Sequence, residues 1–214
     1  MHAKSICHRD IKLENILLVT QSTDSIRRSN LTEVPPSPIS PTFDRLQQFS
    51  FLPTIRLADF GLARPYPPGE RLSSRCGSEE YASPQLLRGE QGYHPEKTDI
   101  WALGCVLFAM LTGEMAFHSS GPGSVRRMYT KICSGHYTWP KHIAVPSTSA
   151  SVPPETEQEK QVFVISEEAK RIVQRCLDVD ESRRADSAEL LHHPWLSKYQ
   201  SGPSSDALSS ITKG

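Results

Sequence analysis

The residues with the clearest chemical potential lie near the start of the sequence, at positions 8–15 (HRDIKLEN). A carboxylate such as Asp10 can orient a hydroxyl group and accept its proton during phosphoryl transfer. Lys12 can place positive charge beside a moving phosphate. Asn15 supplies an amide oxygen, which is a ligand type that Mg²⁺ accepts. This spacing predicts a loop that catalyses phosphoryl transfer to a hydroxyl.

A second group, Asp59, Phe60 and Gly61, directly follows a short β-type run. Asp59 can hold Mg²⁺ against nucleotide phosphates, and Gly61 is expected to give the backbone freedom to place that carboxylate. Alone, such a triplet is usually an ordinary turn. Its place after the first motif favours one metal–nucleotide pocket, on which Asp10, Asn15 and Asp59 converge.

Two short β-type runs, 16–19 (ILLV) and 55–58 (IRLA), flank a long polar stretch at about 20–53. Lengthening a surface loop adds little closure entropy, so the two runs are expected to pair as one hairpin. Residues 145–161 are also rich in polar residues. We therefore expect one domain over residues 1–199 with two flexible insertions, and a disordered tail over 200–214.

Three segments carry helical patterns. Residues 98–111 are apolar on all sides, which predicts a buried central helix. An amphipathic helix is expected at 167–177, with Ser166 as its N-cap, and a final short helix at 187–196. The expected fold class is therefore mainly α, with a small β-hairpin at the active site.

Composition narrows the possible functions of the 214 residues. Lys plus Arg equals Asp plus Glu, 24 each, so net charge gives no argument for binding nucleic acid or a membrane surface. The longest apolar stretch, 100–111, is too short to span a bilayer. The five cysteines show no close pairing, which argues against disulfides or a zinc site. We expect an intracellular protein, cytoplasmic or nuclear.

These motifs resemble those of the eukaryotic protein kinase family. The resemblance covers nearly all of the chain that we expect to be structured. Its landmarks are the catalytic loop at 8–15, the metal-binding triplet at 59–61, the end of the activation segment at 77–85 (GSEEYASPQ), the central helix at 99–104 (DIWALG) and Arg184. It implies the C-terminal lobe of a kinase fold without the N-terminal lobe.

The resemblance implies a role for each matching residue, with ATP and Mg²⁺ as cofactors. Asp10 would be the catalytic base and Lys12 would contact the γ-phosphate. Asn15 and Asp59 would bind Mg²⁺, and Leu17 would lie beneath the adenine.

Other matches imply structural roles. Asp99 would brace the catalytic loop from the central helix, and His8 would join Phe60 in a hydrophobic spine. One residue departs from the family, since Gln85 stands where a glutamate usually pairs with the arginine matched by Arg184. Gln85 can hydrogen-bond Arg184 but cannot neutralise it, so Arg184 is expected to find its counterion in Asp180 or Glu181 instead.

Lys12 and Ser78 resemble the residues found at these positions in serine/threonine kinases rather than in tyrosine kinases. The resemblance implies protein substrates with Ser or Thr acceptors. Residues 131–140 (KICSGHYTWP) and 192–196 (HHPWL) resemble the calmodulin-dependent and AMP-activated group. Glu14 is expected to give at most a modest preference for basic substrates, because Ala109 stands where some relatives carry a second acid.

Arg9 suggests regulation, because its charge requires a partner. In this family the partner is usually a phosphate on the activation segment. Ser74 is the expected site and Ser73 the runner-up, which implies an upstream activating kinase.

The 214 residues contain no glycine-rich GxGxxG loop and no strand lysine before residues 8–15. Phosphoryl transfer needs an aligned, dry site, so we expect this polypeptide alone to have little or no activity. One interpretation is a truncated but otherwise active kinase, and the alternative is a kinase-like binding or decoy module without catalysis. A small-molecule phosphotransferase fits less well, because it would lack the activation segment.

Overall fold

The computed structural model describes residues 1–19, 54–89, 92–140 and 164–200. The chain divides into two compact units. The helical unit comprises Met1–Leu13 and Phe60–Gly214, and the hairpin unit comprises Glu14–Asp59. The expected insertions at 20–53 and 145–161 and the tail beyond residue 200 lie outside the described residues.

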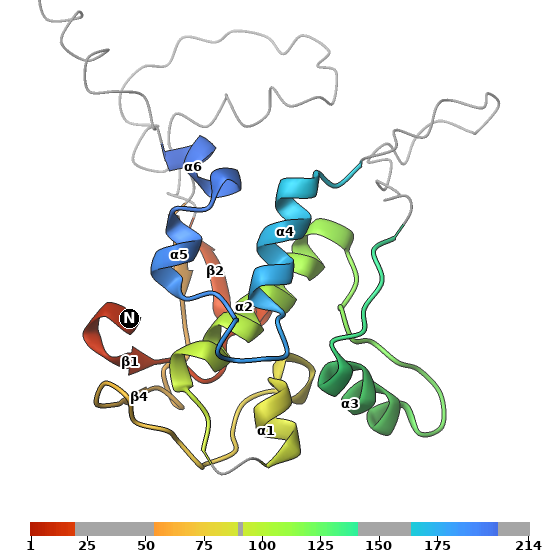
Figure 1. Cartoon of the computed structure of the whole chain (residues 1–214), viewed down its shortest axis with the longest axis horizontal. Coiled ribbons are helices and arrows are strands. Elements are labelled where there is room, and N and C mark those ends of the chain that lie inside the picture. The colour runs from red at the N-terminus through yellow and green to blue at the C-terminus, as the bar shows by residue number, and fades with distance from the viewer. Residues whose placement is uncertain (20–53, 90–91, 141–163, 201–214) are drawn as a thin grey trace, which may run out of the picture. The chain divides into compact units, whose positions relative to one another are not determined.

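The helical unit contains the helices α1 to α6 (Figure 1). Their bounds are α1 Pro84–Arg88, α2 Pro95–Thr112, α3 Ser124–Ser134, α4 Glu167–Cys176, α5 Ser187–Leu191 and α6 Pro194–Gln200. Two short strands, β1 (Ile6–Cys7) and β4 (Arg64–Pro65), pair antiparallel. Short 3-10 helices lie at His2–Lys4 and Glu79–Tyr81.

Helix α2 runs through the middle of this unit, and α4 packs along it (Figure 1). It begins with Pro95 at its first turn, where the missing N–H of proline costs no hydrogen bond. Trp101 and Cys105 are completely buried. The prediction of a buried central helix is confirmed, and the helix is longer than residues 98–111.

Aromatic side chains fill the space beside α2. Trp101 stacks on Phe117 with ring centroids 5.4 Å apart, and Phe108 packs against Trp139 at 4.8 Å. The Tyr137 ring meets the Phe117 ring edge-on at 5.8 Å. Such pairs add to the stability gained from apolar burial, so this cluster fixes the segment after α3 against the central helix.

The C-terminal helices differ in part from expectation. Ser166 caps α4 as predicted, because its Oγ accepts a hydrogen bond from the Ala169 N–H at 3.2 Å. The single helix expected at 187–196 is wrong, since the chain breaks after Leu191 and a new helix begins at Pro194. Proline is favoured in a first helical turn but interrupts a helix interior, which accounts for the break.

The hairpin unit contains the strands β2 (Ile16–Val19) and β3 (Thr54–Leu57), which pair antiparallel. The register places Ile16 opposite Leu57. A 3-10 turn, Leu13–Asn15, leads into β2. The predicted pairing of the two runs is confirmed, with the second strand starting one residue earlier than expected.

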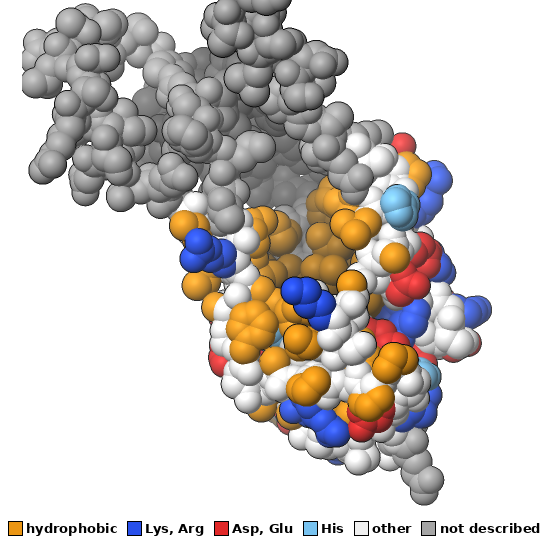
Figure 2. All heavy atoms as spheres, turned by 90° about the vertical axis from the view of Figure 1, so that its left-hand side faces the viewer, with side chains coloured by type: hydrophobic (Ala, Val, Ile, Leu, Met, Phe, Trp, Pro, Cys, Tyr) orange, Lys and Arg blue, Asp and Glu red, His pale blue; other side chains and the backbone are white. Residues whose placement is uncertain are grey.

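Large apolar side chains remain exposed in both units. In the hairpin unit they are Leu17, Leu18 and Ile55. In the helical unit they include Phe60, Leu62 and Met110. Figure 2 shows a face on which hydrophobic side chains are interspersed with charged ones. No helix among the described residues is long and apolar enough to cross a membrane. All five cysteines are free thiols.

Candidate active site

Asp99 of α2 organises the loop that carries the catalytic motif. Its two carboxylate oxygens accept hydrogen bonds from the backbone N–H groups of His8 and Arg9, each at 2.8 Å. The Nε2 atom of His2 lies 2.9 Å from the same carboxylate. Arg9 has a φ of 66°, a left-handed backbone conformation that is costly for residues other than glycine. The buried Asp99 therefore holds the loop in a conformation that it would not adopt alone.

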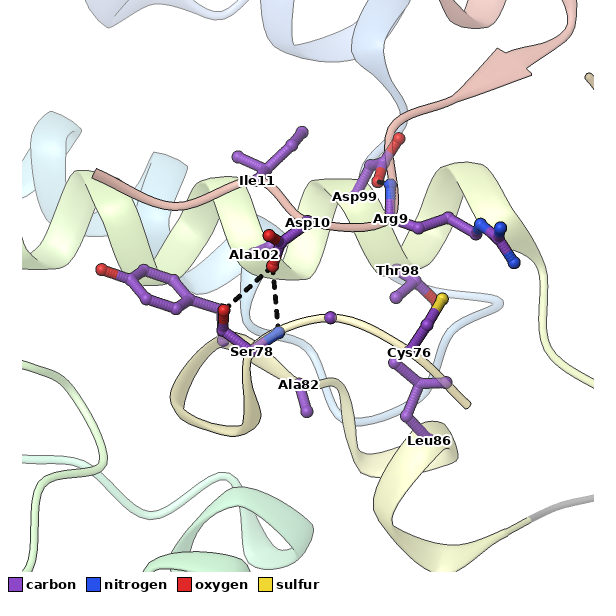
Figure 3. A pocket seen from close by; sticks show the side chains of 12 residues that line it. Arg9, Asp10, Ile11, Cys76, Ser78, Ala82, Leu86, Thr98, Asp99 and Ala102 are labelled. Carbon is purple, nitrogen blue, oxygen red and sulfur yellow. Dashed lines mark hydrogen bonds between the residues drawn. The ribbon is translucent and has the colours of Figure 1, made fainter. Parts of the chain in front are cut away.

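Asp10 points towards Ser78, whereas the neighbouring Arg9 side chain extends the other way (Figure 3). The Asp10 Oδ1 atom accepts hydrogen bonds from the Ser78 N–H and Oγ–H, both at 3.0 Å. The Lys12 Nζ atom lies 2.9 Å from Asp10 Oδ2 and donates to Ser78 Oγ at 3.1 Å. A hydroxyl group is thus held between a carboxylate and an ammonium.

Two opposing influences act on the Asp10 carboxyl. Burial by itself would raise its pKa, but hydrogen bonds from Lys12 and Ser78 outweigh burial and lower the pKa below its ordinary value. Asp10 is therefore ionised at neutral pH, which is the form that accepts hydrogen bonds and protons.

Gly77 brings the activation segment against the catalytic loop. Its φ is 93°, and a Cβ atom added there would lie 2.4 Å from the Arg9 carbonyl oxygen. That distance is shorter than any real contact of a Cβ atom, so only glycine permits this approach. The absent side chain allows the Ser78 N–H to reach Asp10.

The Arg9 guanidinium contacts the activation segment at two points. Its Nε donates to the Leu62 carbonyl oxygen at 2.7 Å, and its Nη1 donates to Ser74 Oγ at 2.9 Å. The Tyr93 hydroxyl donates to the Ser74 carbonyl oxygen at 2.9 Å. Ser73, the other regulatory candidate, is exposed. Ser74 thus lies directly against the cation that the sequence singled out.

The ring of His8 is completely buried and meets the Phe60 ring edge-on, with centroids 5.1 Å apart. The Phe60 side chain is nonetheless 52 % exposed. The pair joins the catalytic loop to the start of the activation segment through an apolar contact.

In the hairpin unit, Asn15 and Asp59 lie at the same end of the strand pair. The Ala58 N–H donates to the Asn15 carbonyl oxygen at 2.8 Å, which places the residues before β2 and after β3 side by side. Asn15 is buried and Asp59 is exposed. Leu17 of β2 is 48 % exposed, and Glu14 is exposed. Convergence of Asp10, in the helical unit, with Asn15 and Asp59 stays a prediction.

The expected backbone freedom at Gly61 stays a prediction. The positive φ in this triplet belongs to Asp59, at 59°, and Gly61 has no positive φ. Non-glycine residues in this conformation concentrate at functional sites, where surrounding contacts hold them. The left-handed backbone conformation therefore belongs to Asp59, the residue expected to bind the metal.

Gln85 and Arg184 meet in the interior. The Arg184 Nη2 atom donates to Gln85 Oε1 at 2.9 Å, and its other nitrogens donate to the carbonyl oxygens of Asp178 and Lys97. The guanidinium also lies over the Trp101 ring, 4.9 Å from its centroid. Burial lowers the pKa of Arg184 to about 10.

The expected direct ion pair between Arg184 and an acid at 180 or 181 does not form, although the nearby charge of Glu181 still acts to raise the pKa of Arg184. The Glu181 carboxylate instead lies 2.6 Å from Arg71. Asp180 lies 3.6 Å from Arg183. Carbonyl and amide oxygens provide the hydrogen bonds that the buried guanidinium needs, so it is satisfied without a carboxylate.

Two contributors were missed by sequence reasoning. His2 contacts Asp99 and Tyr93 contacts Ser74, across separations of 97 and 19 residues. Neither residue belongs to a motif with local spacing. Only the position of His2 shortly before residues 8–15 could have drawn attention to it.

A sequence profile described as the protein kinase domain matches residues 1–196. The chain therefore belongs to the protein kinase family.

Among similar proteins, the probable serine/threonine-protein kinase HSL1 of Saccharomyces cerevisiae is 29 % identical, over 99 % of this chain and 10 % of that protein. The probable serine/threonine-protein kinase MARK-A of Dictyostelium discoideum is 31 % identical, over 92 % and 13 %. The SNF-related serine/threonine-protein kinase of Homo sapiens is 30 % identical, over 70 % and 16 %. The chain thus spans between 10 % and 16 % of the length of these relatives.

Proposed function

We propose that the chain is the C-terminal catalytic lobe of a serine/threonine protein kinase, which in its full-length protein transfers the γ-phosphate of ATP to Ser or Thr hydroxyls of proteins. The arrangement of Asp10, Lys12 and Ser78 carries the proposal. A hydroxyl donates to the Asp10 carboxylate and accepts from the Lys12 ammonium, both within hydrogen-bonding distance. A substrate hydroxyl needs the same two partners.

In this role Asp10 orients the substrate hydroxyl and accepts its proton. Its lowered pKa keeps it ionised, and the Lys12 charge lies close enough to stabilise negative charge developing on the transferred phosphate. Asp99 contributes by holding the backbone of the loop, so Asp10 needs little reorganisation before the reaction.

The residues present also fit ATP and Mg²⁺. Asn15 and Asp59 offer an amide and a carboxylate oxygen at one end of the hairpin unit, and Mg²⁺ prefers such oxygen ligands. When bound, the metal would neutralise charge on the nucleotide phosphates. Leu17, on β2, offers an exposed apolar side chain for the adenine.

We further propose that a phosphate on Ser74 activates the protein, with Ser73 as a second acceptor. The hydrogen bond between Arg9 and Ser74 supports this, because a phosphate at that position would lie beside a guanidinium. An upstream kinase would add the phosphate.

The proposed substrate preference and subgroup rest on Glu14 and on two sequence segments. Glu14 is an exposed acid close in sequence to the catalytic loop, which supports at most a modest preference for basic substrates. Membership of the calmodulin-dependent and AMP-activated group rests on residues 131–140 and 192–196 alone.

The proposal is tested with the longest natural form of the protein that can be expressed. That protein is expected to label Ser/Thr peptides from radioactive ATP, and Asp10→Asn is expected to reduce the rate by about 10²–10⁴-fold. The 214-residue polypeptide alone is expected to show little activity. The exposed variant Glu80→Gln is the control. Equal rates for Asp10→Asn and wild type would refute the assignment, and no labelling by any form would favour a binding module.

A further inference from the structure

Arg71, in the activation segment, reaches the loop that follows α4. Its Nη2 atom lies 2.6 Å from Glu181 Oε1 and donates to the Gly92 carbonyl oxygen at 2.9 Å. The second Glu181 oxygen accepts a hydrogen bond from the His94 N–H at 3.3 Å. One ion pair therefore connects three segments: the activation segment, the residues before α2 and the loop after α4.

The backbone next to this ion pair is also closely fitted. Leu72 and Tyr93 are both buried and exchange two backbone hydrogen bonds, at 2.9 and 2.8 Å. Gly92 has a φ of 81°, and a Cβ atom there would lie 2.8 Å from the Arg71 Cβ. Glycine therefore makes the room that Arg71 needs to pass towards Glu181.

The charges in this region explain why the contact matters in this chain. Arg184, in the same loop as Glu181, bonds to the neutral Gln85 rather than to a carboxylate. Glu181 acts on Arg184 through its charge without a hydrogen bond, while its two oxygens contact Arg71 and the His94 N–H directly. The Glu181 side chain is 13 % exposed and the Arg71 side chain is 40 % exposed, so solvent screens this pair in part.

The Arg71–Glu181 ion pair is connected to Ser74 through Leu72 and Tyr93. Tyr93 pairs with Leu72 through its backbone and donates its hydroxyl hydrogen to the Ser74 carbonyl oxygen. On its other side, Ser74 Oγ accepts from Arg9. Loss of the Arg71–Glu181 pair would loosen Leu72 and Tyr93, and through them one of the two contacts that place Ser74.

We infer that Arg71 and Glu181 are positioning residues, which hold the activation segment so that Ser74 lies against Arg9. The inference rests on the proposed role of this segment in a protein kinase. It assigns to the pair a task that sequence motifs do not, because neither residue lies in the catalytic loop, the metal-binding triplet or residues 77–85.

Hydrogen–deuterium exchange of the full chain tests the inference without any assay of activity. The variants Arg71→Met and Glu181→Gln are expected to speed exchange of the Leu72 and Tyr93 amides on the order of tenfold. Amides of α2 should exchange as in wild type. The matched controls are Arg64→Met and Glu70→Gln, because these residues form an ion pair of 3.1 Å within the same segment. They should leave the Leu72 and Tyr93 amides unchanged.

Arg71→Lys keeps a positive charge beside Glu181 and should exchange more slowly than Arg71→Met, a difference that the size of the side chain alone would not produce. Unchanged exchange in both single variants would overturn the inference. Faster exchange throughout α2 would also overturn it, because the pair would then stabilise the whole unit. Absence of phosphate transfer by the longest natural form would contradict the proposed function but would leave the exchange result intact, so the two failures are distinguishable.

Discussion

The side chain of Gln85 joins Arg184 to the backbone of the loop after α4. Its Oε1 accepts from Arg184 Nη2 at 2.9 Å, while its Nε2 donates to the Val179 carbonyl oxygen at 2.8 Å. A glutamate would bring a counterion to the guanidinium, but it would set one of its oxygens against Val179 in place of a donor. The amide is therefore matched to both neighbours, which a charge-based reading of this position overlooks.

Removing that amide should destabilise the protein. Gln85→Ala leaves a buried guanidinium nitrogen and a carbonyl oxygen without this partner, and the expected loss in free energy of unfolding is about 2–3 kcal/mol. Chemical denaturation measures it. Gln174→Ala removes an exposed amide from α4 and should change stability by less than about 0.5 kcal/mol. Equal effects of the two variants would contradict the role given to Gln85.

Phosphorylation of Ser74 should stabilise the activation segment through Arg9. The added charge lies beside the guanidinium, and an exposed pair of this kind is expected to contribute about 1 kcal/mol to unfolding free energy. Comparing phosphorylated and unphosphorylated protein measures the gain. Arg9→Met should abolish it and Ser73→Ala should leave it unchanged. Mass spectrometry of active protein with no phosphate at either serine would sink the regulatory proposal.

Acidification should remove the stabilising contribution of Asp10. The pKa of Asp10 is lower in the folded chain than its ordinary value of 3.8. Between the folded pKa and pH 3.8 the unfolded state therefore binds more protons than the folded state. The contribution is complete above pH 3.8 and is lost as pH falls through the folded pKa. The difference in unfolding free energy between wild type and Asp10→Asn should therefore shrink on acidification. Glu80→Gln, which removes an exposed acid from the activation segment, is the charge control. A difference that grows at low pH would contradict the predicted sign.

The N-terminus of α4 should depend on its cap. Ser166 Oγ accepts from the Ala169 N–H, and Ser166→Ala is expected to lower unfolding free energy by about 1 kcal/mol. Ser124→Ala is the control, because α3 begins at Ser124 and its N-cap residue, Gly123, provides no side-chain cap. Thermal unfolding measures both variants, and Ser166→Ala should be the less stable of the two.

Local patterns predicted the parts of the fold that depend on nearby residues. The hairpin followed from two β-type runs, the buried helix from its apolar residues, and the α4 cap from Ser166. The break between α5 and α6 was missed although Pro194 signals it, because the apolar pattern around it was given more weight.

Contacts across long separations were beyond such reasoning. Arg71 meets Glu181 and Asp99 meets His2 only because the chain returns to the same place after many residues. The same holds for Arg184, whose partners are carbonyl oxygens that no sequence motif marks. Motifs singled out the candidate catalytic side chains, whereas the tertiary arrangement decides which neighbours hold them.

The close approach at Gly77 offers a way to separate chemistry from geometry. A methyl group at position 77 would collide with the Arg9 carbonyl oxygen. Gly77→Ala should therefore separate the activation segment from the catalytic loop without removing any side chain of the candidate site. Such a variant is a more informative inactive reference than one lacking a carboxylate. It keeps the charged side chains of the candidate site, and it is expected to increase the separation between Ser78 and Asp10.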